Sequence, residues 1–241
     1  VEIPGGTYLI GPSANDTMKN SNEVQHQVDL KSFKISKYEI TVEQYKAFVE
    51  ATNAKETRNN VAADIWTGKD NDTKLKARIT WKFDEKGKER LISEYNKPVI
   101  NVTWAEANAF AQWMGCRLPT EAEWEVACRA ETTTSFNIGD CLGTSNANYK
   151  GDIIWIEWND YIVKWKKCLS GEFRKQIMPV GSFAPNSWGL YDMHGNVAEW
   201  CQDIYCTIPI TVQSNTRKCS SENNHVIRGG SWLQSEYDCR S

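Results

Sequence analysis

The second half of the chain constrains the fold most, because it is long and shows no helical period. After about residue 132 the sequence gains Gly, Asn and Ser and carries only short aromatic segments, at 153–158, 177–183 and 189–193. We therefore expect most of this part to be irregular. Ordered loops of such length are uncommon in compact domains and usually need disulfides, a metal or a functional reason. The fold must be one that holds a long loop in place.

The first half contains three helix starts of one kind. Each is a threonine followed three residues later by Gln or Glu, which is the spacing of a capping box. The pairs are Thr41 with Gln44, Thr103 with Glu106, and Thr120 with Glu123. Apolar residues then recur at helical spacing. The first helix is predicted over 42–51. The second has a buried stripe from Trp104 to Met114 and is expected to end at Gly115. The third is shorter and begins after Thr120.

Short strands and one polar stretch complete the first half. Alternation at Tyr8 and Ile10 predicts a strand that stops at Gly11, and a second short strand is expected at 33–35. Residues 52–98 are polar, with a hairpin expected over 79–92. We interpret 52–98 as an insertion on one domain that spans 1–241.

Charge and hydropathy exclude two classes of partner. The 241 residues hold 28 Lys+Arg and 31 Asp+Glu, a formal net charge of −3, and no basic block is present, so we expect no nucleic-acid partner. No apolar run approaches the about 18 residues that cross a bilayer, so we expect no transmembrane segment. Val1 to Gly6 lacks the basic and apolar regions of a signal peptide. The protein is therefore expected either to be cytoplasmic or to have lost its signal.

The spacing of the cysteines does not decide between disulfides and reduced thiols. The eight cysteines stand at 116, 128, 141, 168, 201, 206, 219 and 239, and no Cys-x-x-Cys pair occurs. A structural zinc site or a thioredoxin-like centre is therefore not expected. The even number suits up to four disulfides in an oxidising compartment, and buried reduced thiols are the alternative.

Five segments in a fixed order resemble one family. They are 3–11, 98–104, 117–125, 186–200 and 228–232, and include Ile-Pro-Gly-Gly, Arg-Leu-Pro-Thr-Glu-Ala-Glu-Trp, Gly-Asn-Val-Ala-Glu-Trp and Arg-Gly-Gly-Ser-Trp. Together they resemble the formylglycine-generating-enzyme (sulfatase-modifying-factor) type domain, a branch of the C-type lectin fold. This implies an α+β fold with a small twisted antiparallel sheet, two main helices and much ordered loop. Because the family holds oxidases, sulfoxide synthases and binding proteins, the resemblance alone does not fix the function.

One of the two cysteines that bind copper in the oxidases of that family is missing from this sequence. Those copper-dependent oxidases bind the metal through two cysteines, five residues apart, beyond the Arg-Gly-Gly-Ser segment; the matching positions are Gln234 and Cys239. Cu(I) needs soft ligands, and an amide oxygen is a poor one. We therefore expect the protein not to be an enzyme. The alternative is a copper-dependent oxidase in which Cys239 pairs with a thiol that folding brings near.

A narrower resemblance covers 226–241, which looks like the start of the variable region in proteins that diversity-generating retroelements diversify. The resemblance implies diversified, ligand-binding positions at Leu233, Gln234, Ser235, Tyr237 and Asp238, and framework residues at Arg228, Gly229, Gly230, Trp232 and Cys239. Glycine pairs permit backbone conformations that a side chain forbids, which would fix the loop path. The stretch between has no period of 2 or 3.6, as in an exposed recognition loop. Such regions continue to a closing Gly-Phe-Arg strand, which residues 1–241 do not include.

The family also implies a structural calcium site near the Gly-Asn-Val segment. By position, Asp192 and Glu199 would supply carboxylate oxygens, and Gly195 and Val197 backbone carbonyls, a set that suits a hard cation. The alternative is that both carboxylates only bind backbone N–H groups. No cofactor is required by this interpretation.

The sequence thus favours a non-catalytic binding protein that displays a diversified C-terminal loop on a rigid C-type lectin scaffold. Proteins of such systems are commonly exported as surface lipoproteins, so we expect an external ligand, either a protein or a cell-surface component. A structural lectin-like module in a larger assembly is the third possibility.

Overall fold

All three predicted capping boxes open a helix in the computed structural model, which describes residues 1–241 except 15, 17, 21–22, 55–61, 68–72, 78, 153–155, 159–160, 164–170, 208–217 and 220–223. The helices are α1 (Val42–Thr52), α2 (Trp104–Trp113) and α3 (Glu121–Arg129). In each, the threonine hydroxyl accepts from the N3 backbone N–H, and the N3 side chain accepts from the threonine N–H. The predicted helix starts are confirmed.

The expectation for Met114 is wrong. Helix α2 ends at Trp113, and Met114 is its C-cap, with 53% of its surface exposed. The chain turns at Gly115, whose φ is +70°. Because the helix stops before Met114, the side chain of this residue is exposed at the turn and does not extend the buried stripe.

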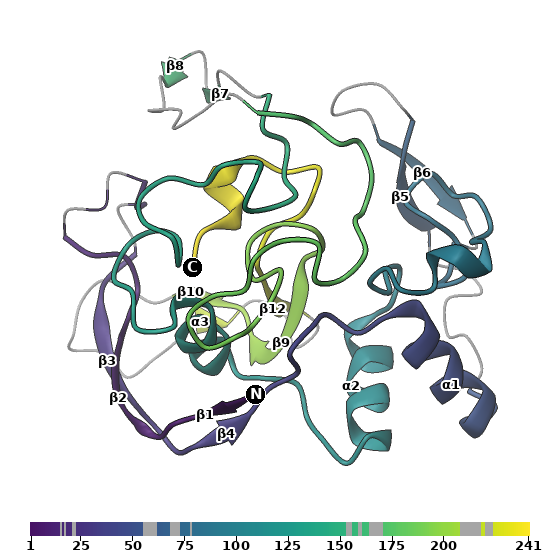
Figure 1. The fold of residues 1–241 in the computed structure, drawn as a ribbon, viewed down its shortest axis with the longest axis horizontal. Helices are drawn as coiled ribbons and strands as arrows, with labels where there is room; N and C mark the ends of the chain where they lie inside the picture. Colours follow the sequence, from purple (N-terminus) through teal and green to yellow (C-terminus); the bar gives the residue numbers. More distant parts are fainter. Residues whose placement is uncertain are drawn as a thin grey trace.

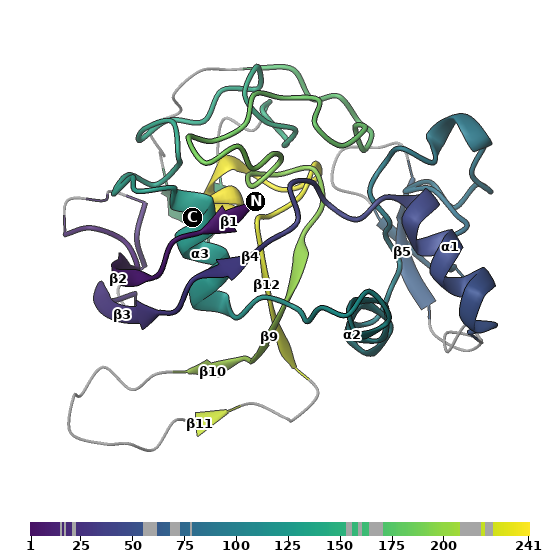
Figure 2. The ribbon, with the colours of Figure 1, turned by 60° about the horizontal axis from the view of Figure 1, so that its bottom comes forward.

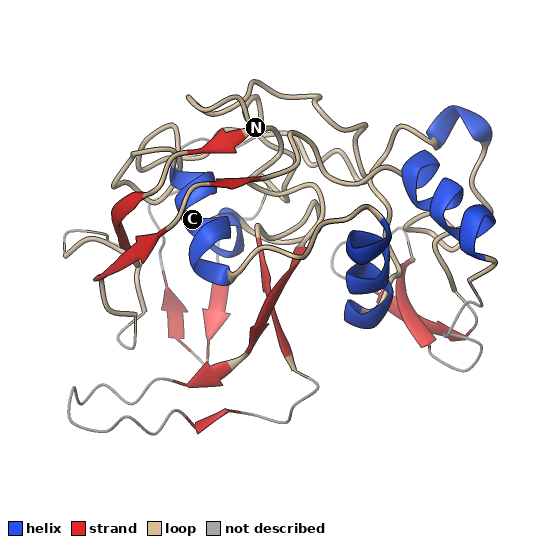
Figure 3. Ribbon diagram, turned by 90° about the horizontal axis from the view of Figure 1, so that it is seen from below, coloured by secondary structure: helices blue, strands red, loops and turns tan. Residues whose placement is uncertain are grey.

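The described strands pair only antiparallel, in two-stranded ladders (Figure 3). These ladders are β1 (Glu2–Ile3) with β4 (Phe33–Lys34), β2 (Gly6–Ile10) with β3 (His26–Leu30), β5 (Ala62–Trp66) with β6 (Thr73–Ala77), β7 (Ile156–Trp158) with β8 (Tyr161–Val163), β9 (Glu199–Ile204) with β12 (His225–Arg228), and β10 (Cys206–Thr207) with β11 (Lys218–Cys219). With three α-helices, this is the predicted α+β fold. Among the described residues the expected antiparallel pairing occurs as six separate two-stranded sheets.

Two of the apolar core clusters form around the helices. Helix α3 lies at the centre of the first, against β2, β9 and β12, and its Trp124 and Ala127 are fully buried beside Leu190 and Cys201 (Figure 1). The second joins α1 to α2 through side chains such as Phe48 and is set to one side. Trp81, from the polar stretch, is buried in this second cluster.

The polar stretch 52–98 contains more structure than its composition suggests. Besides β5 and β6 it has a turn closed by a bridge between Phe83 and Glu89, as expected for the predicted hairpin, and a 3₁₀ turn, η1 (Ile92–Glu94). Its fold as a separate insertion stays a prediction.

The described part of 130–198 has no helix and only β7 and β8, which confirms the predicted irregular region. Its loops lie over helix α3 on the side opposite β10 and β11 (Figure 2).

The described cysteines occur both as disulfides and as free thiols. Cys141 and Cys206 are disulfide-bonded, whereas Cys116, Cys128, Cys201 and Cys239 are free. Among the described residues no helix is long and apolar enough to cross a membrane.

Candidate functional site

The C-terminal segment leaves strand β12 through two glycines in the left-handed region. The φ of Gly229 is +92° and that of Gly230 is +68°. A Cβ on Gly230 would lie 2.7 Å from both the carbonyl oxygen of Asp238 and Sγ of Cys239. The loop therefore returns so closely on its own start that only glycine fits at 230.

Two buried anchors hold the ends of the loop. Trp232 is 6% exposed and packs with Ile177 and Val197, and its ring stacks on Phe173 with centroids 5.9 Å apart. Cys239 is fully buried in a separate cluster with Phe136 and Tyr149 among others. Both anchors contact the core, so the two ends of the loop are held by packing outside the stretch between them.

The residues between the anchors differ in exposure. Gln234 and Asp238 are exposed, Leu233 and Tyr237 are half-buried, and Ser235 is buried. The N–H and the hydroxyl of Ser235 both donate to Oδ2 of Asp238, at 3.1 and 2.8 Å, which caps the 3₁₀ helix η2 (Glu236–Cys239). Of the five predicted variable positions, four therefore present surface, and Ser235 presents almost none.

The predicted copper position contains no thiolate pair. Gln234 at the first ligand position accepts from the hydroxyl of Ser231 at 3.0 Å. Burial raises the pKa of the Cys239 thiol far above its usual range. Burial also raises the pKa of Cys128 to about 12. Copper binds the thiolate form of cysteine. The raised pKa values of the Cys239 and Cys128 thiols therefore disfavour copper binding at either residue.

His194 links the two sides of the site. Its Nε2 accepts from the N–H of Asn137 at 3.1 Å, so Nδ1 carries the proton and donates to the carbonyl of Cys239 at 2.8 Å. Burial lowers the pKa of His194 to about 4. The ring is therefore neutral at pH 7, and its hydrogen bond to the carbonyl of Cys239 holds the end of η2 in place.

Two buried carboxylates, Glu39 and Asp192, and the half-buried Glu199 lie near enough to repel one another. Glu39 accepts from Nδ2 of Asn196 at 2.8 Å and from the N–H of Val197 at 3.2 Å. Burial, and then the charges of Asp192 and Glu199, raise its pKa well above the usual range. Burial also raises the pKa of Glu199 to about 7 and raises the pKa of Asp192. Sequence reasoning missed Glu39, since its partners lie more than 150 residues away.

The carboxylates of the two predicted calcium ligands, Asp192 and Glu199, each accept a hydrogen bond from the protein. Asp192 accepts through Oδ2 from the N–H of Gly181 at 2.6 Å, and Glu199 accepts from Nε1 of Trp124 at 3.1 Å. Oδ1 of Asp192 is buried with no hydrogen-bond partner. Within the described ranges, no group of three His, Cys, Asp or Glu side chains is arranged to hold a metal ion.

The glycine-hinged loop, its buried anchors and the long irregular region define a C-type-lectin-like protein of the formylglycine-generating-enzyme type. The model of the sulfatase-modifying factor enzyme 1-like domain matches residues 1–241, and the chain belongs to that family.

Individual relatives agree with this assignment. The chain is 29% identical to serine/threonine-protein kinase pkn1 of Chlamydia caviae, covering 100% of this chain but 34% of that protein. It is also 29% identical to the formylglycine-generating enzyme of Thermomonospora curvata, over 99% and 84% of the two chains. The solved structure of Treponema denticola variable protein 1 has the same fold, with a TM-score of 0.60, 21% identity, and coverage of 99% and 85%. The chain thus spans about a third of the first relative and most of the others.

Proposed function

We propose that this protein is a non-catalytic ligand-binding protein whose C-terminal stretch, residues 233–238, is diversified by a retroelement. The observation that carries the proposal is the separation of roles along that stretch. Trp232 and Cys239 are buried in separate core clusters, and the side chains of Gln234 and Asp238 between them are exposed. Side chains at such positions can change while the core contacts persist, which suits a variable binding surface.

The fold likeness to Treponema denticola variable protein 1 supports this proposal. The ligand would be external, a protein or a cell-surface component, and the protein would be exported and anchored as a surface lipoprotein. Fractionation of the native host with a protease-protection assay tests the location: digestion in intact cells supports export, and protection until lysis contradicts it.

The deciding experiment is sequencing of this gene from sibling isolates. We expect substitutions concentrated at Leu233, Gln234, Ser235, Tyr237 and Asp238, arising at adenine positions of a template, with Trp232 and Cys239 constant. Ser235 is the least tolerant of these positions, because its side chain is buried and caps η2. Substitutions spread evenly over the chain contradict the proposal.

The family relation to formylglycine-generating enzymes keeps a copper oxidase as the second candidate. Titration of the reduced protein with Cu(I) in a competing chelator separates the two. We expect no binding that depends on Cys239, because its thiol is buried and Gln234 occupies the first ligand position in place of a cysteine. Cys116→Ser removes an exposed free cysteine and controls for adventitious binding. Stoichiometric copper lost only in Cys239→Ser would favour the oxidase.

We propose a structural calcium ion at Asp192 and Glu199, with the carbonyls of Gly195 and Val197. The buried Oδ1 of Asp192 without a partner fits such an ion, as do two neighbouring carboxylates whose charges repel. The ion would neutralise them and hold the loop that carries Val197 against Trp232. Elemental analysis of the purified protein, and its melting temperature with and without chelator, test this: Asp192→Asn should abolish any chelator effect.

A further inference from the structure

The carboxylate of Glu23 accepts four hydrogen bonds, which is its full capacity. Arg240 donates from Nη1 to Oε2 and from Nη2 to Oε1, each at 3.0 Å. Asn20 supplies the other two, from its backbone N–H to Oε2 and from Nδ2 to Oε1, each at 3.0 Å. Although burial alone would raise it, the pKa of Glu23 is lowered by these bonds. Glu23 is therefore ionised at neutral pH and fully occupied.

Both partners of Glu23 also hold Tyr237. Nε of Arg240 donates to the carbonyl of Tyr237 at 3.0 Å, and its guanidinium carbon lies 4.3 Å from the centroid of the tyrosine ring. Because Nδ2 of Asn20 is bound to Glu23, its Oδ1 faces the hydroxyl of Tyr237 and accepts a hydrogen bond from it. Tyr237 is thus held at its carbonyl, its ring and its hydroxyl.

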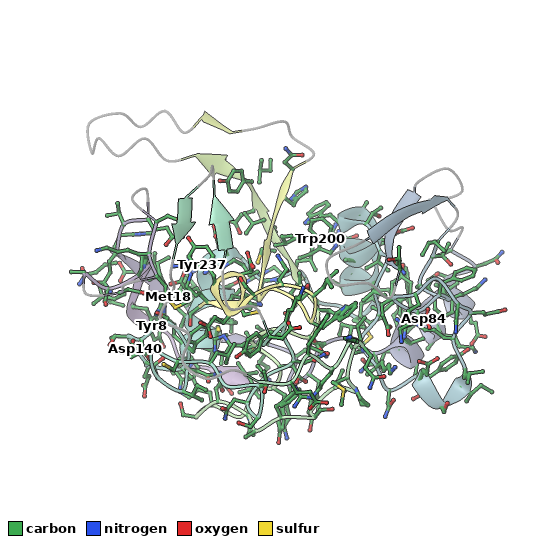
Figure 4. The ribbon with its side chains drawn as sticks, turned by 90° about the horizontal axis from the view of Figure 1, so that it is seen from above. Tyr8, Met18, Asp84, Asp140, Trp200 and Tyr237 are labelled. Carbon is green, nitrogen blue, oxygen red and sulfur yellow. The ribbon has the colours of Figure 1, made fainter. Side chains whose placement is uncertain are left out.

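Tyr237 also packs against apolar side chains. The ring packs against the cluster that contains Met18 and Cys239, and the stick view shows Tyr237 and Met18 close together (Figure 4). Met18, Asn20 and Glu23 all come from the segment between β2 and β3, at the other end of the sequence. These three residues therefore bring an N-terminal segment into contact with Tyr237 and Arg240.

We propose that Glu23 is a positioning residue for the side chain at position 237, and that it acts through Arg240 and Asn20. The inference rests on the proposed function, since it concerns how the binding face is arranged. A guanidinium clamped by two parallel hydrogen bonds presents a rigid flat surface. Aromatic or amide side chains at 237 stack on that surface while Glu23 keeps it in place. Fixing a contact side chain before binding lowers the entropy lost on association.

Nuclear magnetic resonance of the full chain with ring-¹³C-labelled tyrosine tests the proposal without a ligand. Tyr237→Phe assigns the Tyr237 signal. In Glu23→Gln we expect this signal to move toward its position in the urea-unfolded protein, because the amide NH₂ of glutamine cannot accept from Arg240 or Asn20. Arg240→Lys retains the charge but loses the fork, so it should move the signal in the same direction. The double variant should move it no further than the larger single change.

Glu94→Gln is the matched control. Its ion pair with Lys97 has side-chain exposures of 22% and 13%, close to the 30% and 13% of Glu23 and Arg240. This variant should leave the Tyr237 signal in place. An unmoved signal in Glu23→Gln, or an equal shift in Glu94→Gln, overturns the proposal. If Glu23→Gln does not fold, Glu23→Asp replaces it, with an intermediate shift as the supporting result and no shift as the contrary one.

This measurement is independent of the proposed function. Absence of sequence diversity at 233–238 would reject the binding role and leave the Tyr237 signal responsive to Glu23. An unresponsive signal would reject the positioning role alone.

Discussion

The backbone N–H of Trp232 donates a hydrogen bond to the carbonyl oxygen of Asn196 at 3.0 Å. Asn196 is fully buried, and its side chain accepts from Asn148 at 3.0 Å and donates to Glu39 at 2.8 Å. The start of the variable stretch is therefore attached to a polar network in the core. Its position does not depend on the side chains that follow it.

Trp232→Ala should lower the free energy of unfolding by about 3–5 kcal/mol, because it removes a large buried side chain and leaves a cavity. Gln234→Ala, two residues on, should change it by less than about 0.5 kcal/mol, because its side chain is exposed. Urea unfolding of both variants measures the contrast. Equal losses would show that the stretch is ordinary core.

Gly230→Ala should destabilise the protein more than Gly115→Ala does. The two glycines have nearly the same φ, +68° and +70°, so both variants carry the strain of a left-handed alanine, about 1 kcal/mol. A Cβ at 115 meets nothing within 4 Å, whereas one at 230 meets the Asp238 carbonyl at 2.7 Å. Overpacking should add about 1–3 kcal/mol at 230. Urea midpoints that coincide would contradict the close approach.

The free energy of unfolding should depend on His194 in the acid range. Its pKa is lowered to about 4 in the folded protein, against about 6.5 when unfolded. The unfolded chain binds the proton first, so stability is full above pH 6.5 and falls as the pH drops toward 4, by about 3 kcal/mol in all. His194→Asn should be less stable at pH 7 and show a shallower loss between pH 6.5 and 4.5. Parallel pH profiles would contradict a buried neutral imidazole.

Glu39→Ala should cost about 2–5 kcal/mol, because the N–H of Val197 loses its side-chain acceptor and Nδ2 of Asn196 loses one of its two acceptors, the other being the carbonyl of Met178. Glu50→Ala, on helix α1, is the control: its side chain is 63% exposed, and its ion pair with Lys46 is at the surface. That change should stay within about 0.5 kcal/mol. Thermal or urea unfolding gives both values, and a small effect of Glu39→Ala would show that the network is dispensable.

The helix starts could be predicted because a capping box is a local device. Thr41 and Gln44 satisfy each other's backbone groups across three residues, with no help from the rest of the chain. Helix ends depend on what covers them, and the error at Met114 shows this. The periodicity continued to that residue, but no packed element buries it.

The sequence by itself determined the helix starts, the glycine hinge at 229–230 and the tryptophan at 232, because each lies in a contiguous motif. It also determined the family, through five such motifs in a fixed order. Only the tertiary structure decided that Ser235 is buried, that Glu39 supports Asn196, and that Glu23 reaches Tyr237 through Arg240. These contacts join positions 157 and 217 residues apart for Glu39–Asn196 and Glu23–Arg240. A hydrogen bond requires a separation near 3 Å in space, and the path of the intervening chain, rather than the spacing along it, sets that separation.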